Sequence, residues 1–208
     1  MNEPDKTYRM PTAHARVLSI SREEIATLPI KKYEGTIHVV DNDQRLAEAC
    51  AELREESLLG FDIETRPSFH VGESYPPALL QLAGSTAVFV FRLKKLAEFG
   101  PLFELLSNVA ITKAGVAIAE DLKKLRGIRE FEPAGFIDIG ILAREQGFKQ
   151  NGLRTLAGLL LGFRVSKREQ RSNWAALLLT HSQIVYAATD AWASRELYFK
   201  LAGRPRPA

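Results

Sequence analysis

The chain has 208 residues, of which 46% are hydrophobic and 25% are charged. That length suits one domain with a sizeable core and leaves too little for two ordinary domains. The formal net charge of +3 permits a polyanionic partner without requiring one. The single cysteine, Cys50, excludes an intrachain disulfide and a zinc site built from cysteines.

The apolar stretches are too short to span a bilayer, and the first ten residues lack the apolar run of a signal peptide. A lone cysteine is typical of a reducing compartment. We therefore expect a cytoplasmic protein, with no membrane partner and no obligate protein partner.

The first half of the chain predicts short strands after a patternless beginning. Residues 1–19 should be mobile or loosely docked. The capping box of Ser21 and Glu24 predicts a helix that ends near Thr27. Apolar spacing and β-branched content then predict, in order, a strand at 36–40, an amphipathic helix at 42–56, a buried strand at 58–63, and strands at 78–82 and 87–91.

The second half alternates and then becomes helical. We expect a helix at 96–106, a strand at 110–113, a helix at 119–126, a short apolar segment at 136–139, and helices near 140–146, 152–161, 174–179 and 182–201. This order predicts one α/β domain, in which a mixed sheet carries helices on both faces. We divide the chain into an extension at 1–35, a domain at 36–202 and a flexible tail at 203–208.

Acidic residues stand out in three separate segments. Asp62 and Glu64 lie two apart at the end of a predicted strand, so both point to one face. The two carboxylates repel each other unless cations lie between them, which favours a metal site. An acidic pair exposed to solvent at the end of a strand would show the same pattern. Tyr186 and Asp190 share one face of a predicted helix. Asp121 lies in the first turn of another predicted helix, where an acidic side chain also interacts favourably with the helix dipole.

Together the three segments resemble the motifs of the DEDD exonuclease superfamily, in its tyrosine subtype, close to ribonuclease D and to Werner-type exonuclease domains. The matching segments are Phe61–Thr65, Lys113–Leu122 and Tyr186–Ala191. The resemblance covers roughly residues 37–201 and implies a ribonuclease-H-like fold, with about five strands flanked by helices.

The resemblance also implies a chemistry. The chain is expected to be a 3′–5′ exonuclease that uses two divalent cations, Mg²⁺ or Mn²⁺, on a nucleic acid with a free 3′ end. Asp62 would bridge both ions, Glu64 and Asp190 would serve the ion that holds the attacking water, and Asp121 would support the other ion. Tyr186 would orient the water. Asp138 fits either a structural or a supporting role.

Several residues are candidates for nucleic-acid binding. A predicted loop carries Arg164, Lys167, Arg168 and Arg171, which fit either phosphate contacts or a solvated basic loop. Thr65, Gln81 and Trp174 lie in or beside family motifs and are assigned to the same role. Phe69, His70 and Tyr75 are candidates for stacking on a terminal base.

Two alternatives stay open at this point. A non-catalytic nucleic-acid-binding protein could share the fold, although all four acids and the tyrosine are present. Within enzymes, the substrate could be DNA or RNA, since no residue is identified that would contact a 2′-hydroxyl.

Overall fold

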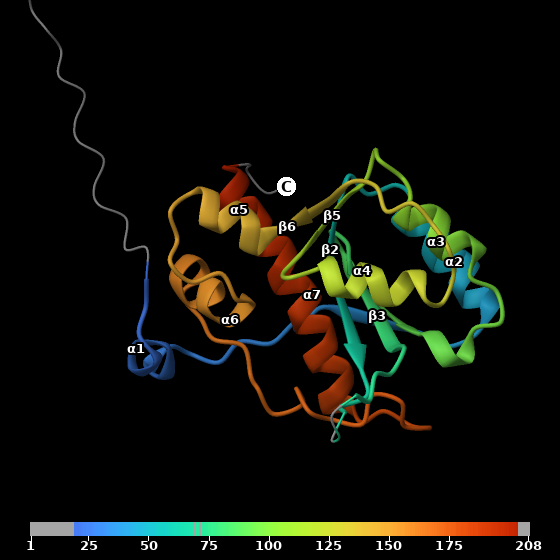
Figure 1. The fold of residues 1–208 in the computed structure, drawn as a ribbon, viewed down its shortest axis with the longest axis horizontal. Helices are drawn as coiled ribbons and strands as arrows, with labels where there is room; N and C mark the ends of the chain where they lie inside the picture. The colour runs from blue at the N-terminus through green and yellow to red at the C-terminus, as the bar shows by residue number, and fades with distance from the viewer. Residues whose placement is uncertain (1–18, 69, 71, 204–208) are drawn as a thin grey trace, which may run out of the picture.

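The computed structural model describes residues 19–68, 70 and 72–203, so the predicted mobile residues 1–18 and most of the predicted tail lie outside the described part (Figure 1). A mixed sheet of six strands forms the centre, in the order β1-β4-β3-β2-β5-β6. The strands are β1 (Thr36–Val40), β2 (Leu58–Thr65), β3 (Pro77–Ala83), β4 (Ala87–Arg92), β5 (Thr112–Gly115) and β6 (Phe136–Asp138).

Strand β3 runs antiparallel to both of its neighbours, and the other pairings are parallel. The predicted α/β class is confirmed, while the expected number of about five strands becomes six. The extra strand, β6, has only three residues, all of which pair with β5. A segment so short carries no periodicity that would separate it from a loop.

Nine helical segments surround the sheet within the described residues. They are α1 (Arg22–Thr27), α2 (Asp43–Leu53), a 3₁₀ turn η1 (Leu93–Lys95), α3 (Gly100–Leu106), α4 (Ala119–Arg126), α5 (Ile139–Glu145), α6 (Leu153–Leu156), a π-helical segment η2 (Ala157–Leu161) and α7 (His181–Ala202). The capping box predicted for α1 is present, because the Ser21 hydroxyl accepts from the Glu24 amide and the Glu24 carboxylate accepts from the Ser21 amide. No helix among the described residues is long and apolar enough to cross a membrane.

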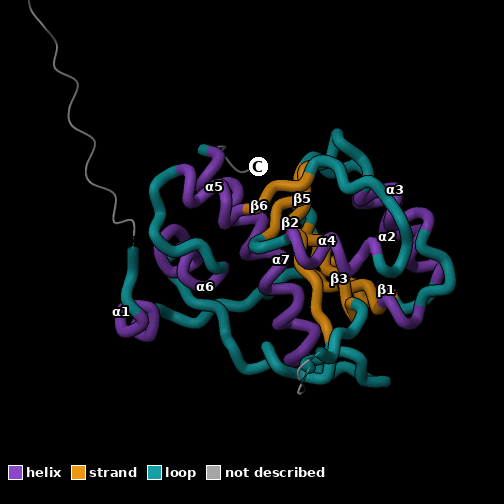
Figure 2. Tube along the Cα trace, in the orientation of Figure 1, coloured by secondary structure: helices purple, strands orange, loops and turns teal. Residues whose placement is uncertain are grey.

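The helices cover both faces of the sheet (Figure 2). On one face, Phe61 and Ile63 of β2 pack in the largest core cluster with residues of α2, α3 and α4. On the other face, α7 crosses β2 and β3, and its residues share two further core clusters with the sheet. Because side chains alternate along a strand, β2 presents Gly60, Asp62 and Glu64 to the face that α7 covers.

The helix predicted at 174–179 is wrong, because these residues form turns. Trp174 is buried, whereas Leu177 and Leu178 are 74% and 81% exposed. The Arg92 guanidinium donates to the carbonyls of Ala176 and Leu177 at 2.8 Å each. Carbonyl groups that bind a side chain of β4 do not need a helical partner, so the tertiary contact replaces the local structure.

Two other predicted helices have different limits in the structure. The helix expected at 96–106 begins at Gly100, where Pro101 lies in the first turn and needs no amide partner. The helix expected at 152–161 is α-helical only over α6 and continues as η2 until Gly162, whose φ of 70° ends it. Left-handed glycine is a common helix stop.

Gly60 allows α7 to lie directly on β2. A Cβ atom at this position would overlap the carbonyl oxygen of Ala191 and would lie 2.9 Å from the Cβ of Arg195. The opposing surface of α7 is formed by Ala187, Ala188 and Ala191, all fully buried. Small residues on both elements therefore set a short separation between the helix and the strand.

The substitution Gly60→Ala should destabilise the fold by about 1–3 kcal/mol, the usual cost of extra volume in a packed core. Urea denaturation measures the change in the free energy of unfolding. Gly152→Ala is the matched control, because a Cβ there meets no atom within 4 Å. Equal losses in the two variants would mean that α7 does not depend on the missing side chain of Gly60.

Candidate active site

The site begins with the two acids of β2. Asp62 and Glu64 are half-buried and face α7, while Ile63 between them is buried in the opposite layer. Asp62 pairs with Gln81 of β3 in the antiparallel register. The register shifts between Glu64 and Thr65, and Thr65 pairs with Pro77. The predicted projection of both carboxylates from one face is therefore confirmed.

Helix α7 brings the third acid to this surface. Asp190 is 7% exposed and lies next to Ala191, the residue whose carbonyl faces Gly60. Tyr186 precedes it by one turn, and its hydroxyl lies close enough to the Asp190 carboxylate for each group to shift the pKa of the other. The Tyr186 ring packs against the buried indole of Trp174, with 5.7 Å between ring centroids. The shared helix face expected from the spacing is present.

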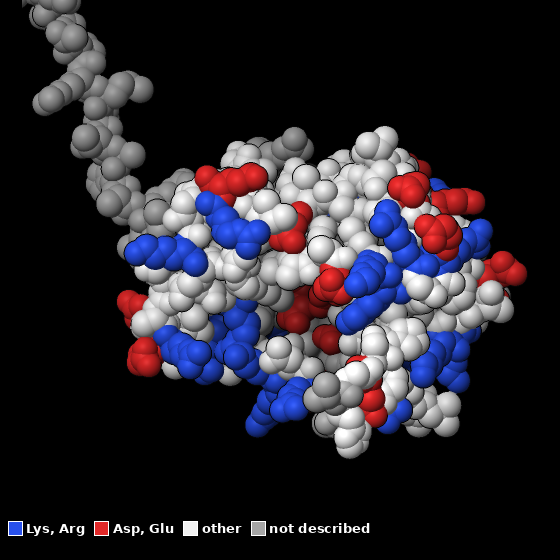
Figure 3. Space-filling model, in the orientation of Figure 1, with Lys and Arg blue, Asp and Glu red and all other residues white. Residues whose placement is uncertain are grey.

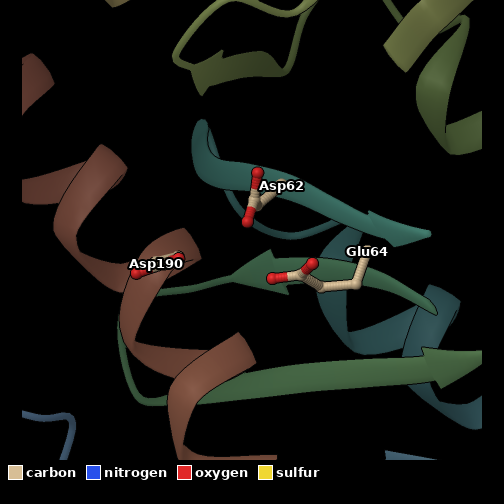
Figure 4. A group of neighbouring side chains, drawn as sticks. All are labelled: Asp62, Glu64 and Asp190. Carbon is tan, nitrogen blue, oxygen red and sulfur yellow. The ribbon is translucent and has the colours of Figure 1, made fainter. Parts of the chain in front are cut away.

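The three carboxylates converge in the space between β2 and α7 (Figure 4). Asp62, Glu64 and Asp190 each offer an oxygen atom, and these atoms all lie within 4.8 Å of one another. Residues more than one hundred positions apart in the sequence thus form one cluster. Such a cluster of oxygen ligands suits a hard divalent cation.

Asp121 lies beside this cluster and is not one of the three grouped ligands. It belongs to the first turn of α4, which follows β5 after a sharp turn with Ala117 at a φ of 58°. The Asp138 carboxylate accepts hydrogen bonds from the amide of Ile118 and from two amides at the start of α5. Asp138 therefore caps α5 and ties the beginning of α4 to β6, which gives it a structural role in placing Asp121.

Burial and mutual repulsion raise the pKa values of the acids. Burial raises the pKa of Glu64 to about 9, aided by the charges of Asp190 and Asp121. Burial raises the pKa of Asp190 to about 7, against the Tyr186 hydrogen bond and the charge of Arg154. Burial also raises the pKa of Asp121 to about 6, although Lys124 opposes it. The pKa of Asp62 rises well above its ordinary value, because of burial and the charges of Glu64, Asp190 and Asp121.

One buried carboxylate oxygen at this place lacks a partner within the described part of the chain and fits a cation. The Oδ1 atom of Asp190 is buried and has no hydrogen-bond partner among the described residues. Buried polar atoms are nearly always paired, so such an atom indicates a partner that is not part of the chain. A divalent cation would satisfy the carboxylate oxygen and relieve the repulsion between the acids. The three grouped carboxylates could hold it, with Asp121 near enough to add negative charge.

A cavity of about 820 Å³ adjoins the Asp190 carboxylate and is lined by Asp190 and Tyr186, whereas Asp62 and Glu64 are not among its lining residues. Of the residues predicted to bind nucleic acid, Arg164, Lys167 and Arg168 line the cavity, whereas Arg171 does not. Thr65 is half-exposed at the end of β2. Figure 3 shows acidic side chains in a hollow on this face, with Lys and Arg side chains gathered on either side.

Two of the predicted contact residues are buried. Gln81 is 0% exposed, and Trp174 is 1% exposed. Neither offers a surface to a base or a phosphate, so the prediction of direct contact is wrong for both. Each has another place in the site: Trp174 supports the ring of Tyr186, and Gln81 pairs with Asp62 across the sheet. Short sequence motifs do not distinguish a residue that contacts the substrate from a buried residue that positions a neighbouring side chain.

The predicted stacking residues have mixed positions. Phe69 lies outside the described residues, and His70 is exposed in the loop after β2. The ring of Tyr75 is half-buried beneath the Arg66 guanidinium, at 4.7 Å. Stacking on a base stays a prediction for His70 and Tyr75.

Sequence patterns did not identify three basic residues that line the cavity, Lys31, Lys32 and Arg154. The two lysines belong to the predicted N-terminal extension, where no motif marks them. Arg154 interrupts an apolar helical run, which is a weak signal, and its Nε atom is buried without a partner among the described residues.

Known proteins share this fold and these segments. A family model described as a 3′–5′ exonuclease matches residues 37–204. The bifunctional 3′–5′ exonuclease/ATP-dependent helicase WRN of Mus musculus is 34% identical over 187 residues, which make up 84% of this chain and 13% of that protein. Ribonuclease D of Acidiphilium cryptum is 31% identical over 170 residues, which make up 80% of this chain and 42% of that protein.

A solved structure agrees with these sequence matches. The crystal structure of Escherichia coli RNase D, an exoribonuclease involved in structured RNA processing, is similar with a TM-score of 0.72 and 26% identity, over 81% of this chain and 46% of that one. The chain spans less than half the length of the curated relatives it matches. The family match includes β2, α4 and α7, the elements that carry the four acids. The chain therefore belongs to the 3′–5′ exonuclease family that includes ribonuclease D and the WRN exonuclease.

Proposed function

We propose that this chain is an active, metal-dependent 3′–5′ exonuclease of the tyrosine subtype, which hydrolyses terminal phosphodiester bonds of DNA or RNA. The observation that carries the proposal is the convergence of Asp62, Glu64 and Asp190, whose ligand atoms lie within 4.8 Å of one another. Their raised pKa values and the unpartnered oxygen of Asp190 describe a site that a cation would complete. Membership of the exonuclease family supports the same activity.

The chemistry divides between the ions and the protein. When bound, two divalent cations would neutralise the phosphate, lower the pKa of the attacking water and stabilise the leaving 3′-oxygen. Asp62, Glu64 and Asp190 would hold the ions, and Asp121 would add negative charge beside them. The rigid contact between β2 and α7 keeps these carboxylates in place before the substrate arrives, which spares reorganisation during the reaction.

Tyr186 would position the attacking water rather than remove its proton. Burial and the charges of Asp190 and Glu64 raise the pKa of this phenol above its ordinary value. A phenol that stays protonated is a poor base and a good hydrogen-bond donor. Its hydroxyl already lies beside Asp190, and Trp174 fixes its ring.

Removing any one of the four acids should abolish most of the activity. Asp62→Asn, Glu64→Gln, Asp121→Asn and Asp190→Asn should each reduce kcat by at least roughly 10²-fold, the scale of one lost electrostatic group in a transition state. Digestion of 5′-labelled DNA and RNA, with Mn²⁺ and with EDTA, measures the rates. Glu120→Gln is the control, since Glu120 is exposed on α4 next to Asp121. Wild-type rates in two or more of the acid variants would refute the assignment of these acids to the active site. If wild type itself cleaves no substrate, the result would favour a non-catalytic nucleic-acid-binding protein.

Tyr186→Phe should lower kcat by about 10²–10⁴-fold, the range for positioned proton-transfer groups. Metal affinity should change little, because the three grouped carboxylates are unchanged in this variant. Single-turnover rates and calorimetric titration with Mn²⁺ test the two halves of this expectation. Tyr198→Phe, on the same helix, should behave as wild type. Loss of Mn²⁺ binding in Tyr186→Phe would contradict the water-positioning role.

Without metal, the free energy of unfolding should fall as the pH rises from about 4 to about 9. The pKa values of Asp121, Asp190 and Glu64 are about 6, about 7 and about 9 in the folded chain, above the value of about 4 for exposed carboxyls. In this range the folded state keeps protons that the unfolded state has released, so rising pH favours unfolding. Urea denaturation in EDTA measures the slope, and Asp190→Asn should make it shallower. An identical slope in that variant would mean that Asp190 does not keep a proton.

Divalent cations should offset this loss at neutral pH. A cation that binds only the folded chain stabilises it by about 2.7 kcal/mol at one hundred times its dissociation constant. The gain should shrink as the pH falls, because the ligands must be deprotonated. Thermal melts with Mn²⁺ should show little shift for Asp62→Asn. Equal shifts for this variant and wild type would place the ion elsewhere.

A further inference from the structure

The segment that precedes the exonuclease domain is docked firmly against it. The family match begins at residue 37, yet residues 29–33 lie beside the loop after η2. The Lys31 amide donates to the Arg164 carbonyl at 3.1 Å, and the Arg164 amide donates to the Pro29 carbonyl at 2.9 Å. The Tyr33 amide donates to the hydroxyl of Thr189, which is adjacent to Asp190. The segment is therefore held on both sides of Lys31 and Lys32.

Helix α1 strengthens this attachment. Ile20 and Gln150 exchange two hydrogen bonds, at 2.9 and 3.0 Å, through the main chain of Ile20 and the side-chain amide of Gln150. Gly158 of η2 lies against Leu28, Ile20 and Ile25, close enough that a Cβ would meet each of them within 3.5 Å. The described part of the predicted extension, residues 19–35, thus packs against the domain that carries the site.

The docked segment contributes Ile30, Lys31 and Lys32 to the lining of the cavity that Tyr186 and Asp190 also line. Six Lys and Arg residues line this cavity, against the two carboxylates of Glu169 and Asp190; the six are Lys31, Lys32, Arg154, Arg164, Lys167 and Arg168. Arg154 lines the cavity together with Asp190, and its buried Nε has no partner among the described residues. Figure 3 shows basic side chains on this face, between the acidic hollow and α1.

The number of Lys and Arg side chains in the cavity indicates which part of a substrate it would hold. The nucleotide that a 3′–5′ exonuclease releases contributes only the scissile phosphate, which belongs at the carboxylates. The retained strand carries one phosphate for each further nucleotide, so it matches a cavity beside Asp190 that is lined by several Lys and Arg side chains. Contacts of this kind position a strand without reading its sequence.

We propose that the segment Pro29–Tyr33 is a wall of the substrate groove, where Lys31 and Lys32 bind backbone phosphates of the retained strand on the 5′ side of the scissile bond. The inference rests on the proposed exonuclease function. It makes the residues before the family domain part of the binding site. It also predicts a preference for 3′ ends with several single-stranded nucleotides over dinucleotides, in DNA or in RNA.

The test compares the double variant Lys31→Gln/Lys32→Gln with the control Lys149→Gln/Lys200→Gln. Both variants remove two exposed lysines, and the control pair does not line the cavity. Rates with Mn²⁺ are measured on a single-stranded oligonucleotide of about 12 residues, a length within the range of single-strand binding sites, and on a dinucleotide. Thermal melts check that both variants fold.

The groove variant should raise KM for the longer oligonucleotide by at least roughly tenfold at ~50 mM salt, with kcat nearly retained. Its KM increase for the dinucleotide should be several-fold smaller. The slope of log KM against log salt should fall by about 1.4, since each single-strand phosphate contact contributes about 0.7. The control should match wild type on both substrates.

The outcomes separate this inference from the proposed function. Cleavage by wild type with the same KM in the groove variant and the control would overturn the inference alone. An equal KM increase for both substrate lengths would also overturn it, because a dinucleotide does not extend along the groove. Failure of wild type to cleave any substrate would overturn the proposed function and, with it, this inference.

Discussion

The contact between the backbone of α7 and Gly60 of β2 is the constraint on which the site depends. Gly60, Asp62 and Glu64 share one face of the strand, and Asp190 is adjacent to the residue whose carbonyl faces Gly60. The distance between helix and strand therefore sets the distance between the carboxylates. Small residues on both surfaces make that distance short, and hydrophobic clusters on both faces of the sheet hold it.

Packing keeps the carboxylates together against their own repulsion. The raised pKa values of Asp62, Glu64 and Asp190 mean that their charged forms oppose the folded state. Among the described residues, the ion pairs found involve other acids, so no salt bridge offsets this cost. The packing of the scaffold thus holds the carboxylates in a preorganised arrangement, and a cation that relieves their repulsion would bind more tightly for that reason.

The charged residues of this protein are separated into an acidic and a basic region, although the net charge is small. The net charge of +3 is modest, but acids gather between β2 and α7 while six basic residues line the adjoining cavity. Cations at the acidic centre would make the whole surface attractive to a polyanion. The N-terminal segment takes part in this arrangement although it lies before the family match, so the boundary of a sequence family need not be the boundary of a site.

The sequence by itself determined the α/β class, most element positions and the four acids, because these depend on local periodicity and on spacing within single segments. It did not determine that Gln81 and Trp174 are buried, that 174–179 forms turns, or that Lys31, Lys32 and Arg154 share a cavity with Asp190. Those features arise from contacts between residues far apart in the chain, such as Arg92 with the carbonyls near 176 and Lys31 with Arg164. Only the tertiary structure decides them, because burial and hydrogen-bond partners are properties of packed elements rather than of a segment's own pattern.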